Sequence, residues 1–273
     1  METQIHVPVG SPVIRKIPIF VDEHNVTEGA MKLIKELRPA WDSSDVRTKL
    51  FTDGTTNKLV GCYVEDTPED VVLVRVYGHK TELIVDRDNE LKSFQVLHAN
   101  GCAPRLYCTF QNGICYEFMQ GDALGTQDVR DPSLLRLISG EMARHVRFID
   151  YEYSSYNYQA FDIGNHFNEF AGMAELDYGL YPSREMQMDW LRVYLQAYKL
   201  FTMKTEEVSQ RELETLYVQV NKFALASHFF WGFWALIQAK YSTIDFDFLG
   251  YAVLRFNQYF ETKPAVMALQ IPE

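Results

Sequence analysis

The sequence predicts an α+β protein with two lobes, a five-stranded antiparallel β lobe followed by a mainly helical lobe. Short runs rich in Val, Tyr and Phe gather before residue 120, which is typical of strands. After it, apolar residues recur at helical spacing. The Gln120-Gly121 pair separates the two patterns. With 273 residues and 47% hydrophobic content, the chain is long enough to bury a core in both lobes.

The first lobe is expected over residues 28–120, after a loose lead-in over 1–27 that is rich in turn-forming residues. Its first helix places Ala30, Leu33, Ile34 and Leu37 on one apolar face. Gly101 provides a C-cap for its second helix, and the Asn112-Gly113 pair a turn between the last two strands. The expected elements are a helix (28–38), three strands (47–52, 58–65, 71–78), a helix (82–101) and two strands (105–110, 114–119).

The second lobe is expected over residues 121–273 and is mainly helical. One strand interrupts the helices, because HVRFIDYE (145–152) is an apolar run that ends in two carboxylates. The expected helices cover 132–144, 161–171, 184–200, 205–239 and 246–260.

Composition excludes several classes of protein. The net charge is −11 and no basic run is present, so nucleic acid is not an expected partner. The most apolar stretch, 223–237, contains Ser227 and His228 and is too short for stable membrane insertion. Four cysteines lack the spacing of a zinc site and are expected to be free thiols. With no apolar signal segment at the start, these features indicate a cytoplasmic protein.

Arg75 lies inside an otherwise apolar strand, VVLVRVYG, and a buried cation needs a partner. Glu90 in the following helix is the candidate. A strand cation paired with a helix carboxylate can hold nucleotide phosphates. A purely structural ion pair, or an Arg75 that faces water, explains the pattern equally well.

The hairpin tip within FTDGTTNKLV (51–60) is polar, and its backbone amides could hold phosphate oxygens. An ordinary β-turn explains the same residues. Asp150 and Glu152 flank Tyr151 at the end of the predicted strand, so their side chains would point the same way. Two such carboxylates suit Mg²⁺, although a solvent-exposed strand edge is the alternative.

Trp231 and Trp234 are three residues apart on one helix and share a face, and Tyr251 follows on the next helix. Aromatic faces attract ammonium ions. Packing in a helical core is the commoner reason for such aromatic residues.

Together these stretches resemble the choline/ethanolamine kinase family, over nearly the whole chain from about residue 28. The resemblance implies a protein-kinase-like fold with ATP and Mg²⁺ as cofactors and ethanolamine as the substrate, phosphorylated to phosphoethanolamine for phosphatidylethanolamine synthesis. It rests on LFTDGTTNKLVGCYVE, VVLVRVYGHKTELIVDRDNE, CAPRLYCTFQNGICYEFMQG, FIDYEYSSYNYQAFDIGNHFNEF and NKFALASHFFWGFWALIQAKYSTIDFDF.

Matched positions in the family imply a role for each candidate residue. The residues implied in nucleotide binding are Asp53, Gly54, Thr55, Thr56 and Asn57 in the hairpin tip, Arg75, Glu90, and Glu117, Phe118, Met119 and Gln120 in the adenine hinge. The residues implied in metal binding are Asp150 and Glu152. The residues implied in the ammonium pocket are Glu169, Trp231, Trp234 and Tyr251.

The chain departs from the family between the hinge and Asp150. The family carries a motif of the form H-N-D-L-x-x-x-N-I there, whose Asp accepts the proton of the substrate hydroxyl and whose Asn holds the metal. Only 29 residues separate Gln120 from Asp150, and none of the seven histidines has an Asp two positions later. The resemblance therefore implies a missing block between Arg144 and His145, as in an isoform that skips an internal exon, and a truncated helical lobe without an identifiable general base.

Three interpretations follow from this gap. In the first, the protein is a working kinase in which another acid replaces the base, with Asp128, Asp131 and Asp162 nearest in sequence. In the second, which the missing loop favours, activity is strongly reduced or absent, and the chain is a non-catalytic isoform. Such an isoform would be a nucleotide-binding module, or a dimer partner of itself or of a full-length relative. In the third, it is a non-enzymatic helical interaction domain.

Overall fold

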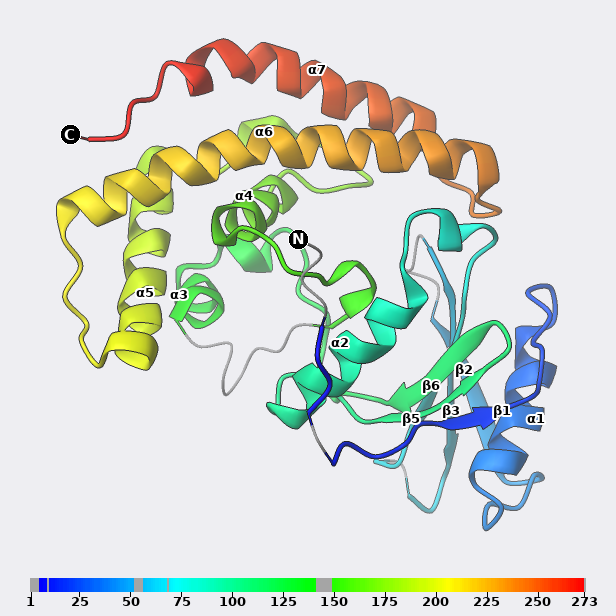
Figure 1. Cartoon of the computed structure of the whole chain (residues 1–273). Helices are drawn as coiled ribbons and strands as arrows, with labels where there is room; N and C mark the ends of the chain where they lie inside the picture. Colours follow the sequence, from blue (N-terminus) through cyan, green and yellow to red (C-terminus); the bar gives the residue numbers. More distant parts are fainter. Residues whose placement is uncertain (1–4, 9, 52–55, 68, 141–148, 273) are drawn as a thin grey trace. The chain divides into compact units, whose positions relative to one another are not determined.

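The computed structural model describes residues 5–8, 10–51, 56–67, 69–140 and 149–272. They form two compact units, shown with the rest of the chain in Figure 1. The segment with Asp150 and Glu152 belongs to the first unit. Unit 1 comprises Met1–Asp122, Phe148–Tyr156 and Tyr241–Phe246; unit 2 comprises Ala123–Arg147, Asn157–Lys240 and Asp247–Glu273.

Unit 1 is built on a six-stranded sheet with the order β1-β5-β6-β4-β3-β2. The five predicted antiparallel strands are present, and β1 adds a sixth, parallel to β5. β1 was not predicted, because three residues are too few for an alternating pattern. The strands are β1 (Arg15–Ile17), β2 (Val46–Phe51), β3 (Lys58–Val64), β4 (Val72–Val76), β5 (Leu106–Phe110) and β6 (Gly113–Glu117).

The segment after β1, expected to be a loose lead-in, is tied into the core of unit 1. Asn112, in the turn between β5 and β6, donates a hydrogen bond to the carbonyl of Val21 (2.8 Å) and accepts one from its N–H (3.0 Å). Val21 is fully buried. It lies so close to Gly29 that a Cβ there would be 2.6 Å from a Val21 methyl group. Residues before 28 are thus part of the fold.

Helices α1 (Val26–Leu37) and α2 (Arg87–Ala99) contact opposite faces of the sheet. Val72, Val74 and Val76 of β4 join the core that α1 covers. Because side chains alternate along a strand, Arg75 points to the other face, where Phe94 of α2 packs on Ile114. All five residues of β4 are buried, which places the arginine in an apolar interior.

The helix predicted over 82–101 is shorter than expected at both ends. A 3-10 turn (Thr81–Leu83) comes first, and α2 begins after Asp86, whose carboxylate accepts a hydrogen bond from the N–H of Asn89 (3.0 Å). Gly101 follows the helix with a φ of +72°, a left-handed conformation that favours glycine, so its predicted capping position is confirmed.

The strand predicted over 145–152 is wrong for its described part. Tyr151–Tyr153 forms a 3-10 turn, closed by a hydrogen bond from the Ser154 N–H to the Tyr151 carbonyl (2.9 Å). A strand needs a neighbour for its backbone groups, and the sheet that the structure describes does not include this segment. Residues 145–148, and the junction between Arg144 and His145, lie outside the described residues.

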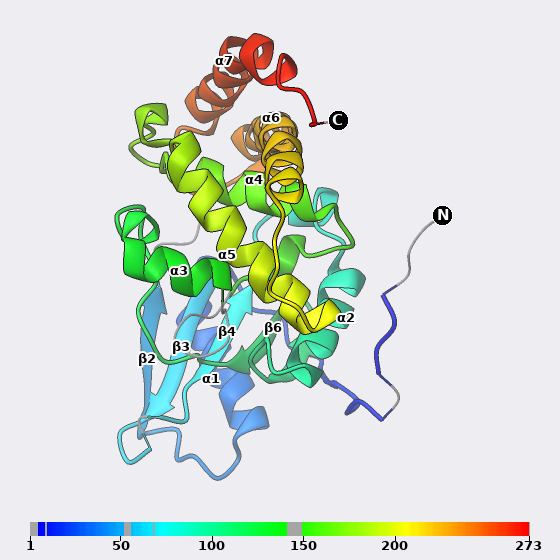
Figure 2. The ribbon, with the colours of Figure 1, turned by 90° about the vertical axis from the view of Figure 1, so that its left-hand side faces the viewer.

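Unit 2 is helical, with two 3-10 turns (Asp128–Arg130, Tyr178–Leu180). Gly164 of α4 lets that helix approach α6, since a Cβ there would be 2.6 Å from the Val220 carbonyl oxygen. α7 runs beside α6 in both Figure 1 and Figure 2. Gly232 of α6 makes room for the ring of Phe256 of α7, since a Cβ at Gly232 would be 2.7 Å from that ring. The helices are α3 (Pro132–Gly140), α4 (Gln159–Glu169), α5 (Arg184–Met203), α6 (Gln210–Tyr241) and α7 (Phe248–Met267).

α6 begins at Gln210, five residues later than predicted. The Ser209 hydroxyl accepts a hydrogen bond from the Glu212 N–H (3.2 Å), and the Glu212 carboxylate accepts one from the Ser209 N–H (2.8 Å). This reciprocal pair is a capping box, which stops the helix from extending toward residue 205.

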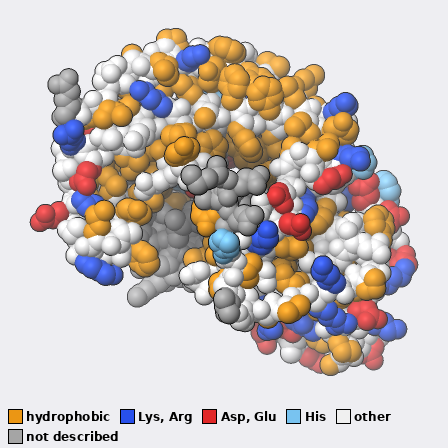
Figure 3. All heavy atoms as spheres, viewed as in Figure 1, with side chains coloured by type: hydrophobic (Ala, Val, Ile, Leu, Met, Phe, Trp, Pro, Cys, Tyr) orange, Lys and Arg blue, Asp and Glu red, His pale blue; other side chains and the backbone are white. Residues whose placement is uncertain are grey.

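Unit 2 exposes apolar side chains along its last two helices. Figure 3 shows hydrophobic atoms gathered over α6 and α7. Phe233 is 54% exposed, and Phe260 is 63% exposed. Even so, within the described ranges we find no helix with the length and apolar character needed to cross a membrane.

Candidate active site

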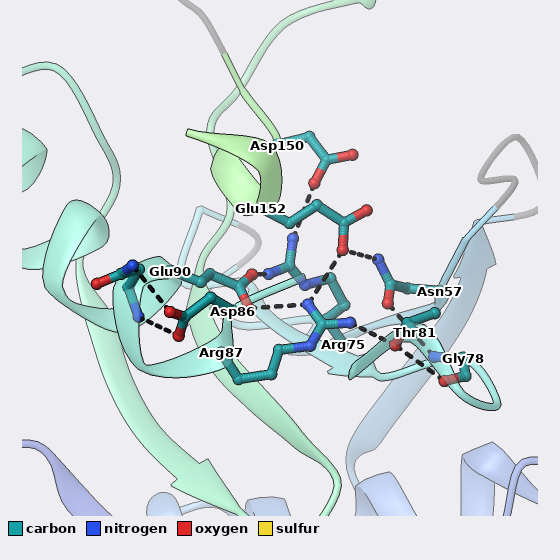
Figure 4. Close-up of polar contacts among 10 residues, drawn as sticks. Asn57, Arg75, Gly78, Thr81, Asp86, Arg87, Glu90, Asp150 and Glu152 are labelled. Atoms are coloured by element: carbon teal, nitrogen blue, oxygen red, sulfur yellow. Dashed lines mark hydrogen bonds and ion pairs between the residues drawn. The ribbon is translucent and has the colours of Figure 1, made fainter. Parts of the chain in front are cut away.

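The predicted pairing of Arg75 with Glu90 is present in unit 1 (Figure 4). Arg75 lies on β4 and Glu90 on α2, and the Nη2 and Oε1 atoms form an ion pair. The carboxylate of Glu90 has no exposed surface, and the Arg75 side chain is 4% exposed. The pair is therefore held in a low-dielectric interior, where removing one partner is costly.

Arg87, which the sequence analysis did not single out, links Glu90 to the acidic segment. Its Nη1 atom donates to Glu90 Oε2 (2.8 Å) and to Glu152 Oε2 (3.1 Å), and Nη2 donates to the Thr81 hydroxyl (2.6 Å). The guanidinium also stacks on Tyr77, 3.7 Å from the ring centre. One side chain thus joins α2, the turn before it and the segment after Asp150.

Glu152 is committed to this network. Its side chain is only 1% exposed, and Oε2 accepts hydrogen bonds from Arg87 and from the Asn57 amide (3.0 Å). Asn57 Oδ1 in turn accepts a weak bond from the Gly78 N–H (3.4 Å). Asn57, at the described end of the hairpin tip, therefore connects that tip to Glu152, one of the two predicted metal-binding carboxylates.

Asp150 is the exposed acid of the cluster. Its Oδ1 atom accepts a hydrogen bond from Arg75 Nη1 (2.8 Å), while 61% of its side chain stays open to solvent. Desolvation by the surrounding protein raises the pKa of the Asp150 carboxyl. The negative charge of Glu152 raises it further, and the positive charge of Arg75 lowers it. Its φ of +61° lies in the left-handed region, which is uncommon for a non-glycine residue.

The two arginines and three carboxylates of this cluster leave one net negative charge. In the part of the chain that the structure describes, no group of three or more His, Cys, Asp or Glu is arranged to hold a metal ion. Mg²⁺, however, often binds one or two carboxylates and completes its shell with phosphate oxygens and water. The exposed oxygens of Asp150 suit that mode, because those of Glu152 are buried.

The other predicted nucleotide-binding residues are only partly described. Asp53, Gly54 and Thr55 lie outside the described residues. Thr56 is buried against Gly78, where a Cβ would be 2.0 Å from the Thr56 carbonyl oxygen.

The predicted hinge follows β6 directly. The Glu117 carboxylate accepts a bond from the Arg105 N–H (3.0 Å), and the Phe118 N–H donates to the Val71 carbonyl (3.1 Å). Met119 is half-buried and Gln120 exposed. The chain at this point is anchored to two neighbouring segments.

In unit 2, the predicted pocket residues Trp231 and Trp234 are neighbours, with ring centres 5.3 Å apart and an edge-to-face arrangement. Trp234 also packs on Phe248 of α7 (5.6 Å). Tyr251 is 6% exposed, and its hydroxyl accepts a hydrogen bond from Arg255 (3.1 Å).

Glu169 is the last residue of α4 and is exposed to solvent. Desolvation raises the pKa of its carboxyl, and the positive charge of Arg255 opposes that rise. An ionised Glu169 would give unit 2 a negative group near Tyr251, with which it interacts electrostatically.

The three acids considered as substitutes for the missing base have local roles in unit 2. Asp128 accepts a hydrogen bond from the Gly125 N–H (2.8 Å), and Asp131 caps the start of α3 through the N–H of Ser133 (2.8 Å). Asp162 accepts one from the Asn157 amide (3.2 Å). Asp128 and Asp131 thus satisfy backbone groups at turns, and this is sufficient reason for their presence.

Replacing Thr81 with valine should test the anchoring of Arg87. Valine keeps the shape but removes the hydroxyl, which accepts from Arg87 and donates to the Gly78 carbonyl (3.0 Å). The free energy of unfolding should fall by about 1.5–3 kcal/mol, the range for a hydrogen bond to a charged group. Urea unfolding followed by circular dichroism measures it. Thr109→Val on β5 is the control, and equal losses in the two variants would contradict a special role for Thr81.

Comparison with known proteins places these features in one family. The sequence model described as choline/ethanolamine kinase matches residues 48–147 and 137–260. Human "Ethanolamine kinase 1" is 48% identical over 363 aligned positions, which cover all of this chain and 80% of the human one. Rat "Ethanolamine kinase 2" is 48% identical, with 97% and 89% covered, and the Drosophila melanogaster ethanolamine kinase is 32% identical, with 94% and 81% covered.

Solved structures agree on the fold. A Plasmodium vivax ethanolamine kinase superposes with a TM-score of 0.74 at 20% sequence identity, covering 89% of this chain and 91% of the other. A choline kinase from Cryptosporidium parvum gives 0.69 at 20% identity, covering 88% and 96%. At this identity the likeness establishes the kinase-like fold.

Proposed function

Because this chain belongs to the choline/ethanolamine kinase family, we propose that unit 1 binds ATP with Mg²⁺ and that the site derives from one that transfers a phosphoryl group to ethanolamine. The observation that carries the proposal is the buried Arg75–Glu90 pair beside the exposed Asp150 carboxylate. A strand cation held by a helix carboxylate, next to a metal-binding aspartate, is the arrangement that orients nucleotide phosphates for transfer.

In this proposal, the residues of the charged cluster in unit 1 have different roles. Glu90 and Tyr116 hold the Arg75 guanidinium, which would contact phosphate oxygens of the nucleotide. Asp150 would hold Mg²⁺, which neutralises phosphate charge when bound. Glu152 supports the site through Arg87 and Asn57, and its metal-binding role stays a prediction.

Two further segments complete the proposed nucleotide site. Backbone amides of the tip (Asp53, Gly54, Thr55, Thr56, Asn57) would contact phosphates, and the hinge (Glu117, Phe118, Met119, Gln120) would contact adenine. Hydrogen bonds that anchor both segments support this. In the tip, Asn57 bonds to Glu152, and in the hinge, Phe118 bonds to Val71.

In unit 2, we propose that Glu169, Trp231, Trp234 and Tyr251 bind the ammonium group of ethanolamine. A carboxylate gives a charge partner, and aromatic faces attract a cation, more strongly where water is excluded. The burial of Trp234 and Tyr251 supports the second point. The named substrates of the relatives support ethanolamine in particular.

We propose also that this chain turns over far more slowly than a relative with the full catalytic loop. The 363 aligned positions exceed the 273 residues of the chain, so at least 90 positions lie opposite no residue of it. The family model matches two segments of the chain that overlap at residues 137–147. The expected break between Arg144 and His145 lies within this overlap. Loss of a positioned base slows a reaction by about 10²- to 10⁴-fold.

The second candidate function is a non-catalytic, nucleotide-binding isoform. One observation favours it: the cluster of two arginines and three acids is complete, although no family-type base loop is present in the sequence. Dimerisation with itself or with a full-length relative, and a cytoplasmic location, stay predictions.

The experiment that tests these proposals is ethanolamine-dependent ADP release by the 273-residue chain, beside the Asp150→Asn variant. Mg²⁺-dependent nucleotide binding is measured in parallel. We expect binding by the native chain, loss of binding in the variant and little turnover in either. Fast turnover that disappears in Asp150→Asn would contradict the loss of catalysis. Binding that needs no Mg²⁺ and survives Asp150→Asn would contradict the assignment of the site.

A further inference from the structure

A continuous network of hydrogen bonds joins two of the proposed pocket residues, Trp231 and Tyr251, inside unit 2. Asn165 Oδ1 accepts hydrogen bonds from Trp231 Nε1 (2.6 Å) and from the Ser227 hydroxyl (2.8 Å). Arg255 donates through Nη2 to Ser227 (3.0 Å) and through Nη1 to the Tyr251 hydroxyl (3.1 Å). The network connects α4, α6 and α7.

The direction of every bond in this network is fixed by chemistry. Ser227 Oγ also receives a bond from the Asn168 amide (3.0 Å). Nitrogen atoms of Arg255 and Asn168 only donate, so the serine proton must point to Asn165. A serine hydroxyl has one donor and two acceptor sites, so all three are in use. Ser227 is fully buried, which leaves no water to take the place of a lost partner.

The orientation of the Asn165 amide is fixed in the same way. An indole N–H and a committed serine proton both require an oxygen, so Oδ1 must face Trp231 and Ser227. Rotation of the indole away from Asn165 would break the hydrogen bond from Trp231 Nε1 at a half-buried position, which is energetically costly. The direction of the Trp231 ring plane is thereby tied to Ser227.

Arg255 provides the charge of the network and is 1% exposed. Among the described residues, its hydrogen bonds end on two hydroxyl groups, which compensate a buried charge less well than a carboxylate does. Glu169 is its electrostatic partner, since Arg255 acts to lower the pKa of that carboxyl. A buried cation thus interacts both with the Tyr251 hydroxyl and with the Glu169 carboxylate, two members of the proposed pocket.

We propose that Arg255, Ser227 and Asn165 are positioning residues for the ammonium pocket, which set the indole of Trp231 and the phenol of Tyr251 in one orientation before the substrate arrives. The inference rests on the proposed function, which assigns these rings to the substrate. A cation is attracted to the face of a ring and not to its edge, so a ring free to turn would bind it less well. Holding the rings in advance reduces the entropy lost on binding.

The test uses the full chain and two variants that interrupt the network at different points, Ser227→Ala and the less buried Asn165→Leu. The first readout is the indole ¹H–¹⁵N resonance of Trp231, identified with Trp231→Phe, with the indole of Trp41 in unit 1 as an internal reference. The second is the affinity for ethanolammonium, measured by calorimetry. Ser93→Ala, which removes a buried hydroxyl in unit 1, is the matched control.

We expect both network variants to move the Trp231 resonance upfield and to weaken ethanolammonium binding at least tenfold, with Trp41 and Ser93→Ala unaffected. An unmoved Trp231 resonance, or an affinity within twofold of the native chain, would overturn the positioning role. If the native chain itself binds no ethanolammonium, the assignment of the rings is wrong and the inference fails with it. The Trp231 resonance would then still report whether the network holds the ring, so the two failures are distinguishable.

Discussion

Replacing Glu90 with glutamine is expected to lower the free energy of unfolding of the protein by about 3–5 kcal/mol, the range for removing one partner of a buried ion pair. The Glu90 carboxylate has no solvent exposure and pairs with both Arg75 and Arg87. Glutamine keeps the shape but removes the charge that both guanidiniums face. Urea unfolding, followed by circular dichroism, measures the loss.

Two control variants, each changing an exposed acid, show whether the loss of stability depends on the burial of Glu90. Asp150→Asn breaks a pair in which the acid is 61% exposed, and Glu82→Gln removes an acid that is 60% exposed and faces Lys80. Both should cost less than about 1 kcal/mol, because the acid in each pair is mostly exposed, and Arg75 keeps its buried partner Glu90 when Asp150 is changed. If Glu90→Gln costs no more than these two, the buried pair is not a stability centre, and its high burial would need another explanation.

Insertion, between Arg144 and His145, of the block that the family resemblance predicts to be missing is expected to raise ethanolamine-dependent turnover by about 10²- to 10⁴-fold, the contribution of a positioned general base. The reason is that the proposed site already pairs Arg75 with Glu90 and holds Asp150 beside them. Phosphoryl transfer depends mainly on positioning and charge, so a restored base and metal ligand should be sufficient. ADP release measures the gain.

The control is the same insertion in an Asp150→Asn background, which should stay inactive. A chimera that folds, binds Mg²⁺-nucleotide and gains no turnover would contradict the idea that the loop is the missing part. An equal gain with and without Asp150 would show that the inserted block works independently of the site in unit 1.

The sequence was informative where a residue contrasted with its surroundings. Arg75 is a cation in the apolar run VVLVRVYG, and both its burial and its pairing with Glu90 are confirmed. Arg87 lies in the polar run VDRDNE, where one more charge gives no contrast, so its central place could not be predicted. Arg255, in YAVLRF, is the same kind of signal as Arg75 and was overlooked. The same argument about buried cations would have found it.

Errors in the predicted elements have a common physical origin. The pattern of HVRFIDYE suits a strand, but a strand depends on hydrogen bonds to a neighbour that its own sequence does not specify. The start of α6 was misplaced although Ser209 and Glu212 carry the spacing of a capping box. β1 is held by its pairing with β5, and the segment after it by the hydrogen bonds of Asn112 to Val21, and the local sequence pattern shows neither.

The short strand β1 has a consequence for how copies of this protein meet. It occupies the outer side of β5, so another chain cannot extend the sheet there without displacing it. The opposite border is β2, where the exposed Arg47 and Lys49 discourage strand addition by a second sheet. β1 is the edge strand on its side and has only three residues, while β2 carries two exposed cations, so edge-to-edge growth, the route by which many sheets aggregate, is opposed at both borders.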